Sequence, residues 1–302
     1  MTIREQLEER ERKDLSPLAC LAAESRGRQR PVEPCPVRTC FQRDTDRIVH
    51  CKAFRRLKRK TQVFLRPEGD HYRTRMTHTL EVTRVARTIA RGLGLNEDLT
   101  EAASLGHDLG HTPFGHAGER IMNELMPGGF RHYEQSLRVV DRLENDGAGL
   151  NLTYEVRRGI LCHSGPDRAE TLEGRAVRIA DKIAYLSADI DDALRGGIIY
   201  PLDIPAEVVQ TLGASHSQRI NTLIMDIIDY SRDKGDILQS PEKKAAMALL
   251  REFMFASVYT NPVAKGEEGK AQEMLERLYS PSASSRRLSP WATAPTPTPS
   301  RC

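Results

Sequence analysis

The chain has 302 residues, enough for one large domain with a substantial core, and its net charge is only +3 with 29% charged residues. This balance excludes a general polyelectrolyte binder, so any basic function must be local. No stretch approaches the roughly 20 apolar residues of a membrane span, and the charged N-terminal segment has no apolar signal core. We therefore expect a cytoplasmic protein without a membrane partner.

The cysteines carry no recognisable site. They lack the paired C-x-x-C spacing of a zinc site, and without an export signal we expect them to be reduced. The six are Cys20, Cys35, Cys40, Cys51, Cys162 and Cys302. We assign them no chemistry.

The first sixty residues are predicted to form a helix, an irregular arm and a second helix. Residues 2–14 are a charged helix candidate, whereas Pro and Arg interrupt residues 15–39. Apolar residues recur at three- and four-residue steps in 44–57, which predicts a helix. The side chains that we expect to face a core are Ile48, Val49, Phe54 and Leu57.

One short β-hairpin is the only sheet that the sequence supports, with residues 61–65 and 71–74 flanking the turn-like segment 67–70. Apolar periodicity predicts helices in most of the remaining chain. These helices are expected at 75–92, 97–110, 116–126, 131–144, 153–163, 173–194, 205–213, 216–234, 241–259 and 267–279. From Ser282 onward, Ser, Pro, Thr and Ala cannot bury enough apolar area to order the chain.

Together these elements predict an all-α fold with a short β-hairpin and a disordered C-terminal tail. We expect an N-terminal helix and irregular arm over 1–42, a helical core with a helical C-terminal extension over 43–280, and the tail over 281–302. Helical metal sites draw their ligands from facing helices. Residues 43–280 should therefore form one continuous core rather than two lobes.

The segment 107–119 carries most of the chemistry, because it holds three His, one Asp and one Glu in thirteen positions. Adjacent His107 and Asp108 offer an imidazole nitrogen and a hard oxygen, which a metal close to the backbone can accept together. A following Thr-Pro step disfavours helix, so a new helix should begin after a turn. That helix places His116 and Glu119 on one face, as a candidate acid/base pair.

Further ligands are needed to complete the metal site, since one His and one Asp bind a metal only weakly. His78 begins the amphipathic helix 75–92, and Asp181 lies between apolar residues of the helix 173–194, where an unpaired carboxylate is costly. Helix capping or a buried salt bridge is the alternative for either residue alone. Two His and two carboxylates suit a divalent Mn, Fe, Co or Ni ion, and Mg is also compatible.

No glycine-rich phosphate loop occurs, so a phosphate must be neutralised by metal and cationic side chains. Arg75 precedes His78 by one helical turn and Lys182 directly follows Asp181, which makes these two cations the best candidates. The run 55–60 has five cations in six positions. Its alternatives are a solvated helix end or a nucleic-acid contact.

The H…HD…D order of the proposed ligands resembles the HD-domain metal-dependent phosphohydrolases. A longer set of motifs is similar to the dGTPase-like branch of these enzymes, the deoxynucleoside triphosphate triphosphohydrolases. The motifs lie in segments 54–64, 107–119 and 132–138. The similarity runs from about Arg43 to Tyr200, roughly half of the chain.

The resemblance implies a reaction in which water attacks the α-phosphorus and releases a deoxynucleoside and intact inorganic triphosphate. The leaving 5′ oxygen needs a proton, which His116 supported by Glu119 would supply. His111 would line the phosphate side. The family commonly forms oligomers, so a homo-oligomer is implied as well.

The resemblance also assigns the sugar contacts. Gln62 would contact the sugar or the base, Tyr185 would stack under the deoxyribose where a 2′-hydroxyl clashes, and Asp189 would accept a hydrogen bond from the 3′-hydroxyl. An ordinary half-buried tyrosine and a solvent-facing aspartate are the alternatives for the last two. His132 and Glu134 belong to the family motif without an assigned role.

Two other functions stay open. Another HD-type phosphohydrolase, acting on nucleoside monophosphates or signalling nucleotides, would use the same four metal ligands. A nucleotide-sensing or nucleic-acid-binding regulator on this fold would use the run 55–60, but it should have lost a ligand, and none is missing. A nucleic acid or an allosteric nucleotide remains open as an additional partner. His163 is expected at the end of a helix, where it can cap carbonyls.

Overall fold

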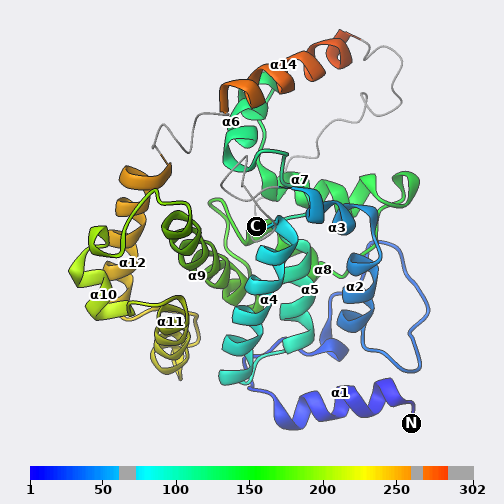
Figure 1. Ribbon diagram of the computed structural model, residues 1–302. Coiled ribbons are helices and arrows are strands. Elements are labelled where there is room, and N and C mark those ends of the chain that lie inside the picture. The colour runs from blue at the N-terminus through cyan, green and yellow to red at the C-terminus, as the bar shows by residue number, and fades with distance from the viewer. Residues whose placement is uncertain (61–72, 260–267, 285–302) are drawn as a thin grey trace.

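The computed structural model describes residues 1–60, 73–259 and 268–284, and it confirms the all-helical class (Figure 1). No β-strand occurs within these ranges, where an isolated antiparallel bridge joins Arg28 to Thr153. Among the same residues, none of the helices is long and apolar enough to cross a membrane. Most of the predicted β-hairpin lies outside the described residues, which include only its last two positions.

Helices make up most of the described chain. The first part contains α1 (Ile3–Asp14), α2 (Cys40–Val49), α3 (Lys52–Arg56), α4 (Arg75–Gly92), α5 (Glu97–Gly106), α6 (Gly115–Leu125) and α7 (His132–Arg138). The second part contains α8 (Tyr154–Cys162), α9 (Leu172–Arg195), α10 (Ala206–Leu212), α11 (His216–Ser231), α12 (Pro241–Met254) and α14 (Glu268–Ser284). Helices α7 and α12 continue into π-helical turns at Val139–Leu143 and Phe255–Tyr259.

Side-chain caps determine where the central helices begin. The Thr74 hydroxyl accepts a hydrogen bond from the Thr77 amide at the start of α4, Asn96 caps α5, and Thr171 caps α9. Such caps satisfy backbone amides that have no partner within the helix. The starts of all three helices therefore agree with the sequence prediction to within one residue.

Two predicted helices are interrupted. The helix expected over 44–57 breaks after His50, and the Cys51 sulfur accepts a hydrogen bond from a backbone amide to start α3. The break leaves Val49 38% exposed, so its predicted core position is wrong, whereas the other three predicted positions are buried. The helix expected over 97–110 ends at Gly106, because His107 becomes its C-terminal cap.

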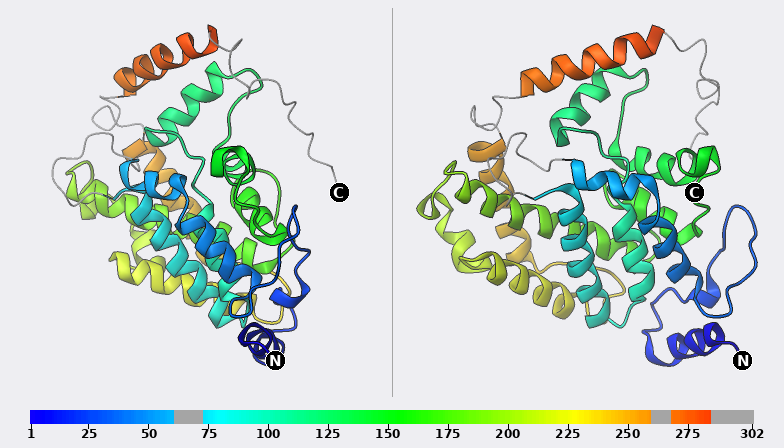
Figure 2. Two further views of the ribbon diagram at one scale, coloured as in Figure 1. Left: turned by 90° about the vertical axis from the view of Figure 1, so that its right-hand side faces the viewer. Right: turned by 45° about the vertical axis from the view of Figure 1, so that its right-hand side comes forward.

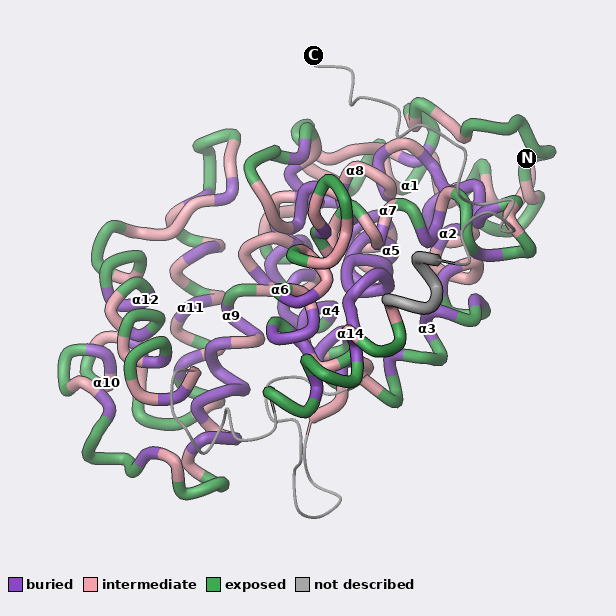
Figure 3. The backbone as a smooth tube through the Cα atoms, turned by 90° about the horizontal axis from the view of Figure 1, so that it is seen from above, coloured by how far each residue is buried: buried purple, intermediate pink, exposed green. Residues whose placement is uncertain are grey.

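Helices α4, α5 and α9 lie side by side in the middle of the molecule (Figures 1 and 3). One face of this group packs on α11 and α12 through apolar residues such as Val82, Ile183 and Leu250. The other side packs on α2 and α8 through residues such as Leu105 and Ile160. The central helices are therefore held from both sides, which gives side chains at their ends fixed positions.

Helix α14 packs on α6, apart from the main group of helices (Figure 2). It continues to Ser284, into the stretch that composition predicts as a tail. Residues 285–302 lie outside the described part of the chain.

Candidate active site

The four predicted metal ligands meet where three helices come together. His78 lies in the first turn of α4, His107 and Asp108 directly follow α5, and Asp181 lies in α9. His78 Nε2 is 3.1 Å from Asp181 Oδ1, and His107 Nε2 is 3.8 Å from both Asp181 Oδ1 and Asp108 Oδ2. All four side chains thus point to one small volume, although their helices are far apart in the sequence.

The donor atoms fit a divalent cation. His107 Nδ1 lies 2.6 Å from the Ser104 carbonyl oxygen, to which it donates a hydrogen bond, so the Nε2 atom of the neutral ring carries the lone pair. That Nε2 is buried and has no hydrogen-bond partner among the described residues. Ligand atoms of His78, His107 and Asp108 all lie within 4.8 Å of one another. Two imidazoles and two carboxylates in this arrangement are a suitable set for a metal with mixed N and O ligands.

Charged neighbours keep the two carboxylates ionised. Burial favours protonation of Asp108, but the Arg75 guanidinium, with Nη1 2.6 Å from Asp108 Oδ2, holds the pKa of this carboxyl well below its usual range. Burial acts in the same way on Asp181, where the hydrogen bond to His78 outweighs it and lowers the pKa. Both groups therefore carry the negative charge that a metal ligand needs.

A close backbone contact positions the turn after α5. A Cβ atom on Gly110 would lie 2.1 Å from the Ser136 amide nitrogen, so only glycine fits there. The Ser136 hydroxyl accepts a hydrogen bond from the Gly110 amide at 2.9 Å and donates one to the His107 carbonyl at 2.7 Å. Helix α7 thereby fixes the backbone of the HD pair.

Lys60 secures the same turn from the other side. Its amine donates to the His111 carbonyl at 2.6 Å, and burial is the main cause that lowers its pKa to about 8. In the sequence, Lys60 is simply the last of the five cations in the run 55–60. The structure separates it from the other four, which are exposed.

The predicted acid/base residues His116 and Glu119 both lie on α6, where Glu119 contacts His132 of α7. The side chain of His116 is 77% exposed, and its Nδ1 is 3.9 Å from Glu119 Oε2. Glu119 has a closer imidazole, since His132 Nδ1 lies 2.9 Å from Glu119 Oε1. The His111 ring stacks on the His132 ring with centroids 4.9 Å apart. Glu119 thus lies near both His116 and His132, and only the pairing with His116 was predicted from the sequence.

Glu134, the family-motif residue without an assigned role, is exposed. The buried residue His163 joins the group of histidines. It ends α8, and its Nδ1 donates to the Ile160 carbonyl at 2.7 Å, so the predicted capping role is confirmed. Its Nε2 lies 3.1 Å from His132 Nε2, and its ring centroid is 4.9 Å from that of His107. Burial lowers the pKa of His163 to about 3.

The predicted sugar-binding residues lie further along α9. Tyr185 is half-buried against the core, and burial raises its pKa to about 12. Asp189 is only 2% exposed, which rules out a solvent-facing side chain. Burial raises its pKa to about 6, although the Tyr259 hydroxyl donates a 2.6 Å hydrogen bond to Oδ2. Asp189 Oδ1 is buried without a partner in the described part of the chain. Gln62 lies outside the described residues.

The predicted phosphate ligands have different environments. Arg75 is buried beside Asp108, while Lys182 is exposed on α9. Partial burial, followed by the positive charges of Arg178 and Arg251, lowers the pKa of Lys182. Arg251 belongs to α12, and sequence analysis did not single it out, because nothing near it in the chain indicates a site.

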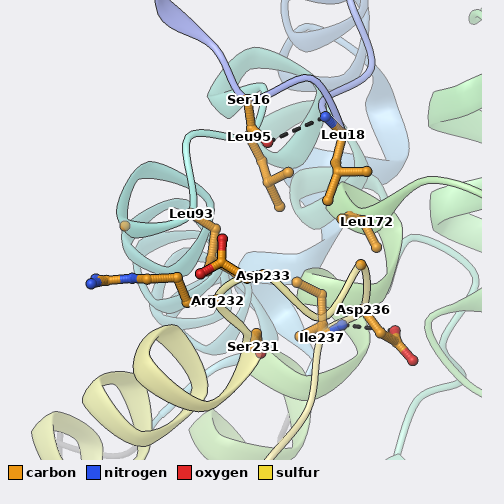
Figure 4. Close-up of a pocket in the computed structure, with 12 residues that line it drawn as sticks. Ser16, Leu18, Leu93, Leu95, Leu172, Ser231, Arg232, Asp233, Asp236 and Ile237 are labelled. Carbon is orange, nitrogen blue, oxygen red and sulfur yellow. Dashed lines mark hydrogen bonds between the residues drawn. The ribbon is translucent and has the colours of Figure 1, made fainter.

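Two cavities lie near opposite ends of α4. The larger, of about 540 Å³, borders the turn at 109–113 and has Lys52, Arg56 and Lys60 in its lining. The smaller, of about 230 Å³, lies at the opposite end of α4, between the N-terminal arm and the segment after α11 (Figure 4). None of the predicted site residues lines the smaller cavity. Only the larger one adjoins the HD turn.

Comparison with known proteins agrees with the geometry. Residues 75–186 match the HD domain, and residues 237–295 match the phosphohydrolase-associated domain. A crystal structure of a hypothetical protein from Aquifex aeolicus shares the fold, with a TM-score of 0.52 and 21% identity over 78% of this chain and 61% of that one.

Curated relatives are much closer in sequence. A deoxyguanosinetriphosphate triphosphohydrolase-like protein from Caldanaerobacter subterraneus subsp. tengcongensis is 58% identical, covering 92% of this chain and 82% of the relative. A protein of the same name from Desulfatibacillum aliphaticivorans is 54% identical, covering 92% and 83%. Together with the HD domain, these names support a hydrolase. The chain therefore belongs to the family of deoxyguanosinetriphosphate triphosphohydrolase-like proteins, whose fold here is an all-helical HD domain.

Proposed function

We propose that the protein hydrolyses deoxynucleoside triphosphates to the deoxynucleoside and inorganic triphosphate. The observation that carries the proposal is the cluster of His78, His107, Asp108 and Asp181, in which His107 Nε2 has no hydrogen-bond partner among the described residues. The names of the relatives point to dGTP as one substrate.

These four residues would hold a divalent ion of Mn, Fe, Co, Ni or Mg. When bound, such an ion neutralises phosphate charge and lowers the pKa of a water molecule, so that a nucleophile forms near neutral pH. The protein supplies the rigid placement, because each ligand comes from the core-packed end or middle of a helix. Asp108 and Asp181 contribute two negative charges to offset those of the ion.

Cationic side chains then bind the triphosphate. Arg75 is already beside Asp108, so its remaining donors are available to a phosphate oxygen next to the metal ligands. Lys182 and Arg251 form a second positive group on α9 and α12, suited to the phosphates further from the sugar. This arrangement replaces the glycine-rich loop that the chain lacks.

Proton transfer is assigned to His116. The leaving 5′ alkoxide has a high pKa and must be protonated as the bond breaks. His116 is exposed, and it can therefore reach a substrate, while Glu119 lies one helical turn away with its Oε2 atom 3.9 Å from His116 Nδ1. His111, whose ring stacks on that of His132, is assigned to the phosphate side of this acid.

Selection of the deoxy sugar is assigned to Tyr185 and Asp189. A tyrosine ring against the sugar leaves no room and no partner for a 2′-hydroxyl. Asp189 has one carboxylate oxygen without a described partner, which can accept a hydrogen bond from the 3′-hydroxyl. The Tyr259 hydroxyl holds the other oxygen in place. Gln62 is assigned to the sugar or base from sequence alone.

Product analysis tests the reaction. Phosphate-31 NMR of reactions in oxygen-18 water, with a panel of dNTPs and NTPs and added Mn, should show tripolyphosphate labelled at a terminal phosphate. The Asp108→Ala protein, prepared in the same way, controls for contaminating phosphatases. Pyrophosphate with a nucleoside monophosphate, or orthophosphate with a diphosphate, would refute the proposal.

Sugar selection has its own test. The Tyr185→Ala variant should narrow the difference in kcat/KM between dGTP and GTP, because it weakens stacking on the deoxy sugar and admits the ribose. A ratio equal to that of the unmodified protein would remove Tyr185 from the proposed sugar site.

We further propose a cytoplasmic homo-oligomer. The apolar side chains of Met274 and Leu278, one helical turn apart on α14, are 53% and 64% exposed, and we propose that a second subunit covers them. Light scattering coupled to size-exclusion chromatography should give a mass above the 34.0 kDa of one chain. A monomer at micromolar concentration would contradict this assembly.

A further inference from the structure

A second group of potential ligands lies next to the proposed metal centre. Asp108, His132 and His163 each offer a ligand atom, and these atoms lie within 4.8 Å of one another. The three residues come from the turn after α5, from α7 and from the end of α8. Asp108 and His163 are buried and His132 is 13% exposed, so water has little access to compensate their polar atoms.

His163 is constructed in the same way as the proposed ligand His107. Each histidine is the C-terminal cap of its helix. Each donates Nδ1–H to the carbonyl three residues earlier, at 2.6 Å for His107 and 2.7 Å for His163. A histidine that ligates a metal almost always commits its other nitrogen to a carbonyl or carboxylate in this manner. His163 therefore presents its Nε2 lone pair to the interior of the site.

His132 completes the pattern from the other side. Its Nδ1 lies 2.9 Å from a Glu119 carboxylate oxygen, which can only accept, so this nitrogen is the donor. Its Nε2 faces His163 Nε2 at 3.1 Å. Because both Nδ1 atoms already donate, each ring has only its Nε2 left to bind a further partner. Either a proton or a metal ion between the two Nε2 atoms accounts for this short contact.

We propose that this cation is a second divalent metal ion, held by Asp108, His132 and His163. Two nitrogens 3.1 Å apart can both lie about 2.1 Å from one ion, at an N–metal–N angle of about 95°. A shared proton would satisfy the two rings alone, whereas a metal ion would also use Asp108, which has a carboxylate oxygen within 4.8 Å of a nitrogen of each ring. The inference rests on the proposed function, because Asp108 would be shared with the first metal site.

The shared carboxylate makes the pair resemble a two-metal phosphoryl-transfer site, in which ions about 3.5–4 Å apart hold the attacking and leaving oxygens. Arg75 opposes the second ion, since its guanidinium contacts Asp108 Oδ2 at 2.6 Å. The second site should therefore bind metal more weakly than the first, and it fills at higher metal concentration.

Manganese titration of the full-length protein tests the proposal. Metal-free protein is dialysed against increasing Mn²⁺, and bound Mn is counted by mass spectrometry and examined by electron paramagnetic resonance. We expect two Mn per chain at saturation, with a spin-coupled spectrum, and one Mn with an isolated-ion spectrum for His163→Ala. The matched control is His50→Ala, because exposed His50 also caps a helix and bonds a carbonyl through Nδ1 at 2.7 Å. This control should still bind two.

The possible failures are distinguishable. One Mn per chain at saturation in the unmodified protein overturns the second site, and so does a His163→Ala protein that binds two. If His163→Ala is misfolded by circular dichroism, His132→Gln removes the same site from another helix and should also bind one Mn. Failure of the proposed function would instead appear as full Mn binding by His78→Ala, which leaves Asp108, His132 and His163 unchanged.

Discussion

Replacing Asp189 by Asn should stabilise the folded protein at neutral pH. Asp189 is 2% exposed, and burial raises its pKa from 3.8 to about 6, so its ionised form destabilises the folded state. The folded pKa lies above the unfolded one. The loss of stability caused by ionising buried Asp189 is therefore absent well below pH 4. It increases between the unfolded and the folded pKa and is complete above pH 6.

The magnitude follows from the shift. A difference of about two pKa units at 1.36 kcal/mol per unit corresponds to about 3 kcal/mol at pH 7.5, and to about half of that at pH 5. Asn keeps an oxygen that can accept from Tyr259, and its neutral amide replaces the oxygen that lacks a described partner. Any amide hydrogen left unpaired reduces the gain, so about 3 kcal/mol is an upper bound.

Urea unfolding of both proteins at pH 5 and pH 7.5, with EDTA to remove metal, measures the difference. The advantage of Asp189→Asn should increase with pH, while dNTP binding weakens because the 3′-hydroxyl loses its anionic acceptor. Tyr259→Phe is the contrasting variant, since it removes the donor to Asp189 and should lower stability by about 1–3 kcal/mol. An Asn variant less stable than the original at pH 7.5, with no pH dependence, would refute the electrostatic argument.

Three further variants test the site itself. Gly110→Ala places a Cβ against the backbone of Ser136, so it should lower the thermal midpoint and weaken metal binding together; an unchanged midpoint would contradict the close packing. Asp108→Ala should lose bound metal and hydrolysis while circular dichroism still shows a helical fold, and full retention of metal would exclude the HD pair as ligands. His116→Ala should retain metal and nucleotide but lose about 10²- to 10⁴-fold in kcat, the usual contribution of a general acid or base. Unimpaired turnover would leave His116 without a role in proton transfer.

Local patterns in the sequence determine the helices and the central motif. Apolar spacing and capping residues act over a few positions, which is why the ends of α4 and α9 agree closely with prediction. The Thr-Pro step and the following glycine act equally locally, and they separate the HD pair from the helix that carries His116. The break after His50 escaped prediction, since the apolar period continues across it and only the cap at Cys51 marks it.

Contacts between distant segments depend on the tertiary structure. Glu119 meets His132, His132 meets His163, and Tyr259 meets Asp189 from 70 positions away. Each of these residues has an ordinary local interpretation as a helix cap, a polar surface group or a half-buried aromatic. Their partners are set by how whole helices pack, and packing energy is summed over many apolar side chains that have no chemistry of their own. The sequence alone therefore determines which residues are available for a site, whereas the packing of α4 through α9 and of α12 decides which of their atoms face one another.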